Sequence, residues 1–228
     1  MKQQLTIGLG AVAIALIVLG FCLKAGMDNF TFRDRTISAR GVAEKEVVAN
    51  KGNASTTVNL SSDDLVDLKN HLIYQSNELR KFAIAKGIAD SCITVDVPNI
   101  YSNSRDYNGN PPEYAYSGAC GITIYTTDVV TLDKYQNSLY QLIDNNILAT
   151  GYAAFDYTEL NDIKPSMISE ATHNARIAAQ QFAKDSGSRI GLIKSANQGY
   201  FSIDNIEGKP AYCKNVRVVT SVEFYLND

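Results

Sequence analysis

The chain has 228 residues, of which 45% are hydrophobic and 20% are charged, an ordinary composition for a folded protein with a sizeable core. Its formal net charge is −3 and it has no run of Lys or Arg, which argues against a nucleic-acid partner because such partners usually require a basic face. The spacing of its four Cys and two His fits no zinc pattern, so we expect neither a metal nor a cofactor.

An uncharged apolar run occupies residues 5–23. As a helix these 19 residues would extend about 28 Å, which is close to the hydrocarbon thickness of a bilayer. The run predicts a transmembrane anchor within residues 1–27, and a cleaved signal peptide is the alternative. Because the N-terminus before the span is basic, the domain formed by residues 28–228 is expected to be exported.

The rest of the chain repeats itself at an offset of about one hundred residues. The heptapeptide "KFAIAKG" occupies residues 81–87, and "QFAKDSG" occupies residues 181–187. Around both, helix and strand signals follow each other in the same order. We therefore predict an internal duplication over about residues 50–127 and 150–227, each copy reading strand, helix, strand, strand.

Each copy contains one amphipathic helix. In the first, roughly residues 62–86, the apolar stripe is Leu65, Leu68, Leu72, Leu79 and Phe82. In the second, the stripe is Ile168, Ala171, Ala175, Ala179 and Phe182. We expect Phe82 and Phe182 to pack the last helical turn against a sheet. Gly87 and Gly187 follow, and each is expected to end its helix and let the chain reverse.

Strand patterns fill most of the remaining sequence. Two β-rich runs follow each helix, at residues 91–102 and 114–127 and again at 189–203 and 212–226. A further helix near residues 128–146 links the copies, and residues 35–50 resemble a leading strand and the start of the next. The sequence thus predicts an α+β fold, in which a duplicated β-α-β-β module forms antiparallel-rich sheets with helices packed on them, preceded by an N-terminal transmembrane helix.

Cysteine positions depend on how the first β-rich pair folds. If it forms a hairpin centred near residue 106, Cys92 and Cys120 fall roughly opposite each other and within disulfide range in favourable registers. Two buried free thiols are the alternative. If Cys92 and Cys120 form a disulfide, Cys213 is left without a disulfide partner in the folded part of the chain.

No catalytic constellation is evident. His71 borders the apolar stripe of its helix, and His173 lies on the polar face of its own. Neither has a Ser or Cys nucleophile placed by a nearby motif. We therefore expect no catalytic residues and no enzyme.

Tyrosines gather on the first predicted hairpin and its loop, at Tyr101, Tyr107, Tyr114 and Tyr116. Tyr offers a large contact area with a polar tip and is common at protein interfaces. The alternative is a strand pair with ordinary cross-strand aromatic contacts, because Tyr also favours strands.

Two stretches resemble a known family. The segment "ELNDIKPSMISEATHNARIAAQQFAKDSGSRIGLIKSANQGYFSI", followed by "KNVRVVTSVEFYL", closely resembles the C-terminal signature of SIMPL-domain proteins, with "LNDIKP", "NAR" and "DSGS" among its specific parts. The stretch "RTISARGVAEKEV" is similar to the opening strand of the same family. The similarity covers about residues 35–227.

The resemblance implies an architecture and self-assembly. SIMPL-domain proteins include periplasmic immunogenic and oxidative-stress-defence proteins of bacteria; they have no established catalytic residues, and some form ring-shaped or channel-like homo-oligomers. The branch with an N-terminal anchor would be a single-pass protein of the bacterial inner membrane, with the C-terminal domain in the periplasm or outside the cell. Relatives often follow the opening strand with an acidic and then an aromatic position. This chain departs from that pattern with "VVANKGNASTTVNL".

These observations favour a non-enzymatic, membrane-anchored envelope protein whose exported domain self-associates into a homo-oligomer. One alternative is a scaffold that binds a protein partner or a small ligand through the Tyr-rich hairpin. Another is thiol-based redox protection through Cys92, Cys120 and Cys213.

Overall fold

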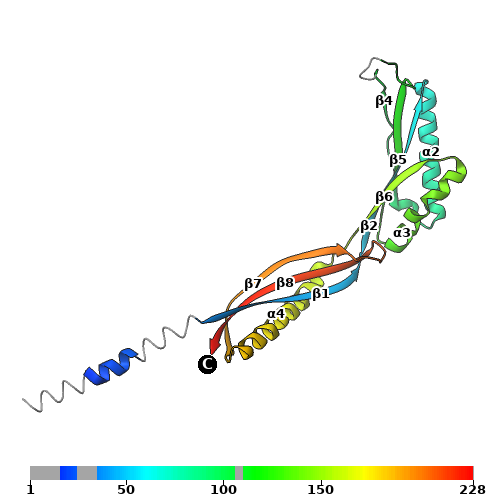
Figure 1. The fold of residues 1–228 in the computed structure, drawn as a ribbon. Coiled ribbons are helices and arrows are strands. Elements are labelled where there is room, and N and C mark those ends of the chain that lie inside the picture. Colours follow the sequence, from blue (N-terminus) through cyan, green and yellow to red (C-terminus); the bar gives the residue numbers. More distant parts are fainter. Residues whose placement is uncertain (1–15, 25–34, 106–109, 228) are drawn as a thin grey trace, which may run out of the picture. The chain divides into compact units, whose positions relative to one another are not determined.

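The structure, a computed structural model, describes residues 16–24, 35–105 and 110–227. It is an α+β fold with two antiparallel sheets (Figure 1). The chain divides into two compact units. Among the described residues, the first contains those up to Glu44, Lys164–Phe201 and those from Arg217 onward; the second contains those within Lys45–Ile163 and Ser202–Val216.

The second unit is built on a five-stranded sheet with the strand order β3-β5-β2-β6, and β4 also pairs with β5. Its strands are β2 (Lys51–Ser62), β3 (Ile93–Val95), β4 (Asn99–Ser102), β5 (Tyr116–Thr126) and β6 (Ala149–Asp156). All of these pairings are antiparallel. Its helices are α2 (Leu65–Ala85) and α3 (Val129–Asn137), with the 3-10 helices η2 (Asp90–Cys92) and η3 (Leu139–Asn145).

Helix α2 packs on this sheet through its apolar stripe. Asp64 caps it, because the Asp64 carboxylate accepts hydrogen bonds from the backbone N–H groups of Val66 and Asp67. Leu72 on α2 and Ile122 on β5 are both fully buried in the resulting core. Burying such a side chain stabilises the fold by roughly 1.5–3 kcal/mol.

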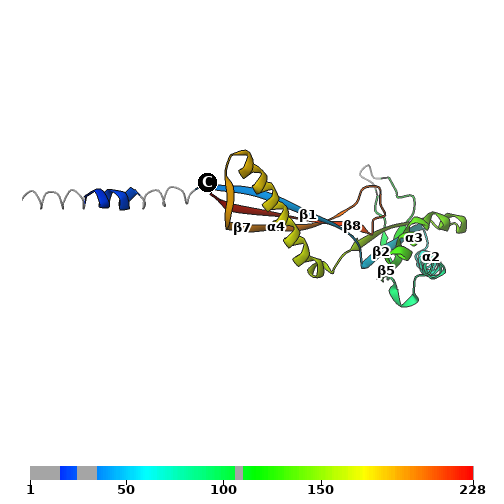
Figure 2. The same cartoon turned by 90° about the horizontal axis from the view of Figure 1, so that it is seen from below.

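Most of the three-stranded sheet β1-β8-β7 lies in the first unit. The elements that lie mainly in this unit are β1 (Thr36–Val48), α4 (Leu160–Asp185), β7 (Arg189–Asn205) and β8 (Cys213–Asn227). In Figure 1 neighbouring strands run in opposite directions, and Figures 1 and 2 both show α4 alongside the sheet. Alternate residues of β8 are buried, which is the pattern of a strand covered on one face: Val216, Val218, Thr220, Val222 and Phe224.

Helix α4 approaches this sheet closely because small residues line its inner face. Ala171, Ala175 and Ala179 recur every fourth residue and are fully buried. A Cβ placed on Gly41 of β1 would lie 1.9 Å from the Ala171 carbonyl oxygen and 2.3 Å from the Ala175 nitrogen. The backbones of β1 and α4 are therefore in direct contact at Gly41, and no larger residue fits there.

The ends of the two long helices differ. Gly87 and Gly187 both adopt the left-handed conformation, with φ of +96° and +73°, directly after α2 and α4. Phe82 packs against the core, with its ring centroid 6.0 Å from that of Tyr135. Phe182, which was expected to pack in the same way, is 60% exposed. On α4 the neighbouring Ala183 makes the buried contact instead.

The order strand, helix, strand, strand occurs twice, as β2-α2-β3-β5 and as β6-α4-β7-β8, with the short β4 inserted in the first. The sheet partners do not follow this order. Strand β6 pairs with β2 in the sheet of the second unit, whereas β7 and β8 share a sheet with β1. The strand that completes the second copy's sheet therefore comes from before the first copy.

The predicted N-terminal transmembrane helix needs correction. Residues 16–24 are helical, and residues 5–15 of the predicted span lie outside the described residues. Across the described ranges, no helix has the length and apolar character needed to cross a membrane. This finding overturns the transmembrane part of the predicted fold class and the single-pass inner-membrane location that depended on it.

Candidate interaction surface

Neither histidine lies in a site with other catalytic groups. His71 is exposed on α2, where its Nδ1 lies 3.6 Å from the Asp67 carboxylate. His173 is exposed on α4. Within the described part of the chain, no group of three or more His, Cys, Asp or Glu is placed to hold a metal ion.

The register of the first sheet separates Cys92 from Cys120. Ile93, the residue after Cys92, pairs with Ile124, which is four residues beyond Cys120. Cys120 is buried, and its thiol donates to the Asp96 carbonyl oxygen at 3.1 Å. Both thiols and that of Cys213 are free. The structure therefore does not bring Cys92 opposite Cys120.

The register of β4 with β5 explains this difference, because Asn99 pairs with Ala119, whereas a hairpin centred near residue 106 would place it opposite Glu113. A break in the first β-rich run makes a smaller change. Residues 96–98 separate β3 from β4, and the pairing with β5 shifts by one residue between them. Pro98 lies in this break and has no backbone N–H to donate to a ladder. The break changes the register by only one residue, so the difference of about five residues at Cys92 comes mainly from the pairing of β4 with β5.

The Tyr-rich hairpin presents part of its aromatic surface. Tyr101 and Tyr114 are exposed, whereas Tyr116 is half-buried and packs against the core. Tyr101 pairs with Ser117 across β4 and β5. Tyr107 lies outside the described residues. Two of the four predicted interface tyrosines are thus available at the surface.

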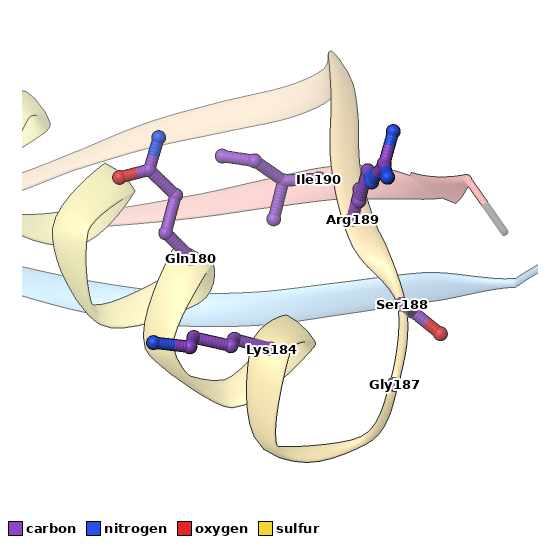
Figure 3. A pocket seen from close by; sticks show the side chains of 6 residues that line it. All are labelled: Gln180, Lys184, Gly187, Ser188, Arg189 and Ile190. Atoms are coloured by element: carbon purple, nitrogen blue, oxygen red, sulfur yellow. The ribbon is translucent and has the colours of Figure 1, made fainter.

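A cavity of about 400 Å³ lies between the last turn of α4 and the start of β7. Its lining residues are Gln180, Lys184, Gly187, Ser188, Arg189 and Ile190 (Figure 3). The two cations lie close to the C-terminal end of α4, where positive charge is favoured by the helix dipole. The lining has no carboxylate or histidine to act beside them, so it offers no acid–base pair.

A second cavity, of about 420 Å³, lies on the outer face of α2. Its charged groups are paired with each other: Arg80 Nη2 lies 2.6 Å from Asp90 Oδ2, and Lys81 Nζ lies 2.7 Å from Glu78 Oε1. These ion pairs are exposed and account for the charges without a ligand.

Strand β7 is the candidate interaction surface. It forms one edge of its sheet, and within the described residues no further strand pairs with its outer side. Residues 192–200 are exposed without interruption, so neither face of this stretch is covered. The exposed side chains include large apolar ones, with Leu192 at 82% and Tyr200 at 100%.

This edge lacks the protection that sheet edges usually have. Between Ile190 and Ile203 the only charged residue is Lys194, and there is no Pro. The Lys194 ammonium is already engaged, because it lies 3.2 Å from Glu223 Oε1 on β8. Hydrogen bonds from Thr36, Lys194 and Ser195 lower the pKa of the Glu223 carboxyl, so this carboxylate remains charged opposite Lys194.

The edges formed by β3 and β4 and by β1 carry such protection. Strands β3 and β4 are only three and four residues long. Strand β1, the other edge of the same sheet, presents the exposed charges Arg40, Glu44, Lys45 and Glu46. Sheet edges of these two kinds resist pairing with another chain. The sequence predicts β7 as a strand, but its edge position depends on which distant strands pair.

Comparison with known proteins gives one match that bears on the chain. The sequence model of the family described as "SIMPL: Protein of unknown function (DUF541)" matches residues 37–219. No curated protein matches the chain.

Similar solved structures include a hydrolase from Listeria innocua, with 13% identity, a TM-score of 0.22, and coverage of 81% of this chain and 91% of that one. Another is an unknown protein from Galdieria sulphuraria, with 6% identity, a TM-score of 0.18, and coverage of 77% and 83%. At such TM-scores neither likeness carries an argument about fold or function.

Proposed function

We propose that this chain, which belongs to the SIMPL family of unknown function, assembles with copies of itself. On this proposal it does not catalyse a reaction. The observation that carries the proposal is the unprotected edge of β7. A 17-residue strand with one open side and exposed Leu192, Ile193 and Tyr200 is a template for pairing with another chain.

The free energies involved favour a contact along the whole of β7 over a contact made by a few side chains. Burying one large apolar side chain contributes roughly 1.5–3 kcal/mol, and each backbone hydrogen bond contributes about 0.5–1.5 kcal/mol. Association costs on the order of 4–15 kcal/mol in lost freedom. Two or three side chains alone would barely offset that cost. A strand pairing along most of β7 would exceed it.

Sedimentation velocity of the full-length chain at micromolar concentration tests the proposal. We expect a species larger than a monomer. The variant Leu192→Lys with Tyr200→Lys is expected to shift the protein to monomer, because lysines are costly to bury at a pairing edge. The matched control is Val66→Lys with Tyr74→Lys, which changes two exposed apolar residues on α2 and should leave assembly intact. A monomeric wild-type chain would overturn the proposal.

A second candidate is capture of a protein partner through the Tyr-rich hairpin. It is supported by the exposure of Tyr101 and Tyr114. The variant Tyr101→Ser with Tyr114→Ser separates the two candidates. Loss of partner capture with an intact oligomer would favour binding, whereas loss of the oligomer would place the hairpin in the assembly contact.

A further inference from the structure

We infer that one face of the five-stranded sheet in the second unit binds a neutral carbohydrate chain. This binding activity is separate from the proposed self-assembly, which uses β7. The surface concerned is called the open face. It consists of alternate residues of β2 and the residues level with them on the other strands: Asn53, Ser55, Thr57, Asn59 and Ser61 of β2, Ser117, Ala119, Gly121, Thr123 and Tyr125 of β5, Thr150, Tyr152 and Ala154 of β6, Thr94 of β3, and Asn99 and Tyr101 of β4.

The two faces of this sheet differ because side chains alternate along each strand. Ala54 and Val58 of β2 are buried, and they share one core with Leu72 of α2 and Leu132 of α3. Both helices therefore pack on the same side of the sheet. The residues of the open face point to the other side, and all of them except Gly121 are exposed or half-buried.

A row of unpaired hydrogen-bonding groups runs along β2 in the middle of the open face. Within the described residues, the side chains of Asn53, Ser55, Thr57 and Asn59 have no hydrogen-bond partner. An Asn amide and a Ser or Thr hydroxyl can each both donate and accept a hydrogen bond. Sugar hydroxyls have the same capacity, so this row can bind successive hydroxyl groups of an extended chain.

Two tyrosines lie on either side of this row. Tyr125 on β5 pairs with Asn53, and Tyr152 on β6 pairs with Ser55. Each is 64% exposed. Given the usual strand spacing and rise per residue, their Cα atoms lie about 12 Å apart. A Tyr ring offers a flat apolar surface to the C–H groups of a sugar ring, while its hydroxyl can still form a hydrogen bond.

The side chains of the open face do not suit other classes of polymer. None of the residues that define it is charged, and Lys51 and Asp156 lie opposite each other beyond its end. A nucleic acid or an acidic polysaccharide would need cations along its path. A protein partner would need an apolar centre, and the open face has no Val, Leu, Ile, Met or Phe. An uncharged chain of hydroxyl-bearing rings matches both its tyrosines and its amide and hydroxyl groups.

Titration calorimetry of the full-length chain with cellohexaose and with chitohexaose tests the inference. Both probes are uncharged, and their rings present flat C–H surfaces. We expect at least one of them to bind and the anionic hexagalacturonate not to bind. Tyr125→Ala with Tyr152→Ala should weaken binding at least about tenfold. The matched control is Tyr74→Ala with Tyr140→Ala, which changes two exposed tyrosines on α2 and η3 and should leave the affinity unchanged.

Failure of both neutral probes to bind at millimolar concentration would overturn the inference. So would preferential binding of hexagalacturonate, or wild-type affinity in the variant that lacks Tyr125 and Tyr152.

Hydroxyl-radical footprinting read by mass spectrometry locates the contact in the wild-type chain. Saturation with the bound probe should protect Tyr125 and Tyr152 from oxidation and leave Tyr74 unchanged. Protection of Tyr125 and Tyr152 by self-association alone, without sugar, would show that a second copy covers the open face and would overturn the inference. A monomeric chain that binds the sugar would instead overturn the proposed self-assembly and leave this inference standing.

Discussion

Two buried threonines provide a matched test of hydrogen-bond satisfaction in the two units. Thr56 on β2 is fully buried, and its Oγ1 lies 2.8 Å from the Tyr135 hydroxyl. Thr220 on β8 is 3% exposed, and its Oγ1 has no hydrogen-bond partner among the described residues. Replacement of each by Val keeps the β-branched shape and exchanges only the hydroxyl for a methyl group.

The expected effects have opposite signs. Thr220→Val removes an unpaired polar group, so it should raise the free energy of unfolding by about 1 kcal/mol. Thr56→Val leaves the Tyr135 hydroxyl buried without a partner, which should lower the free energy of unfolding by about 1–3 kcal/mol. Adding Tyr135→Phe to Thr56→Val removes both hydroxyls and should recover most of that loss, because neither polar group then remains to be satisfied.

Urea unfolding measures the free energies, and native-state hydrogen exchange on α2 and α4 assigns each effect to its own unit. The wild-type chain and Thr57→Val, at the next position of the same strand, serve as references. The reasoning is refuted if Thr220→Val destabilises the protein as much as Thr56→Val does. It is also refuted if the double variant loses more stability than Thr56→Val alone.

Two further predictions concern the same cores. Gly41→Ala should destabilise the first unit by about 3 kcal/mol or more in thermal unfolding, since its Cβ would lie 1.9 Å from the Ala171 carbonyl oxygen, while Ser38→Ala on the same strand should change little. Burial raises the pKa of Tyr135 to about 12, above its ordinary value of 10.0. The folded state therefore keeps this phenol neutral when the unfolded state has lost its proton. Stability should be intact below about pH 10 and fall by roughly 2–3 kcal/mol towards pH 12. Tyr135→Phe should remove that part of the pH dependence; an unchanged slope in this variant would contradict the assignment.

Local periodicity was enough to predict the helices and most strands. The four-residue spacing of Leu68 and Leu72 places both on the buried face of α2, and the alternation from Val216 to Phe224 predicts β8. The same reasoning failed for Phe182, since an apolar residue on the stripe need not be the one that contacts the sheet. On α4 the close approach at Gly41 selects alanines for that contact.

The sequence alone does not predict which strands, far apart in the chain, pair with each other. Nothing in "ATGYAAFD" shows that β6 joins β2, or in "TISARGVAEKEVV" that β1 joins β8. The candidate surface was missed for this reason. The sequence predicts a strand at residues 189–203, yet its exposure results from being the last strand in its sheet. The Tyr-rich hairpin, in contrast, is evident from composition alone.

The contact between α4 and β1 has a consequence for how the helix is positioned. Ala171, Ala175 and Ala179 present nearly identical small steps, so displacement of the helix by one turn, about 5.4 Å, would put a similar surface against Gly41. Uniform packing of this kind opposes separation of helix and strand but does little to oppose sliding. The Asn174 amide donates a hydrogen bond to the Val42 carbonyl oxygen at 2.9 Å. This bond can form at only one position of α4 along its axis, so it fixes the helix relative to β1.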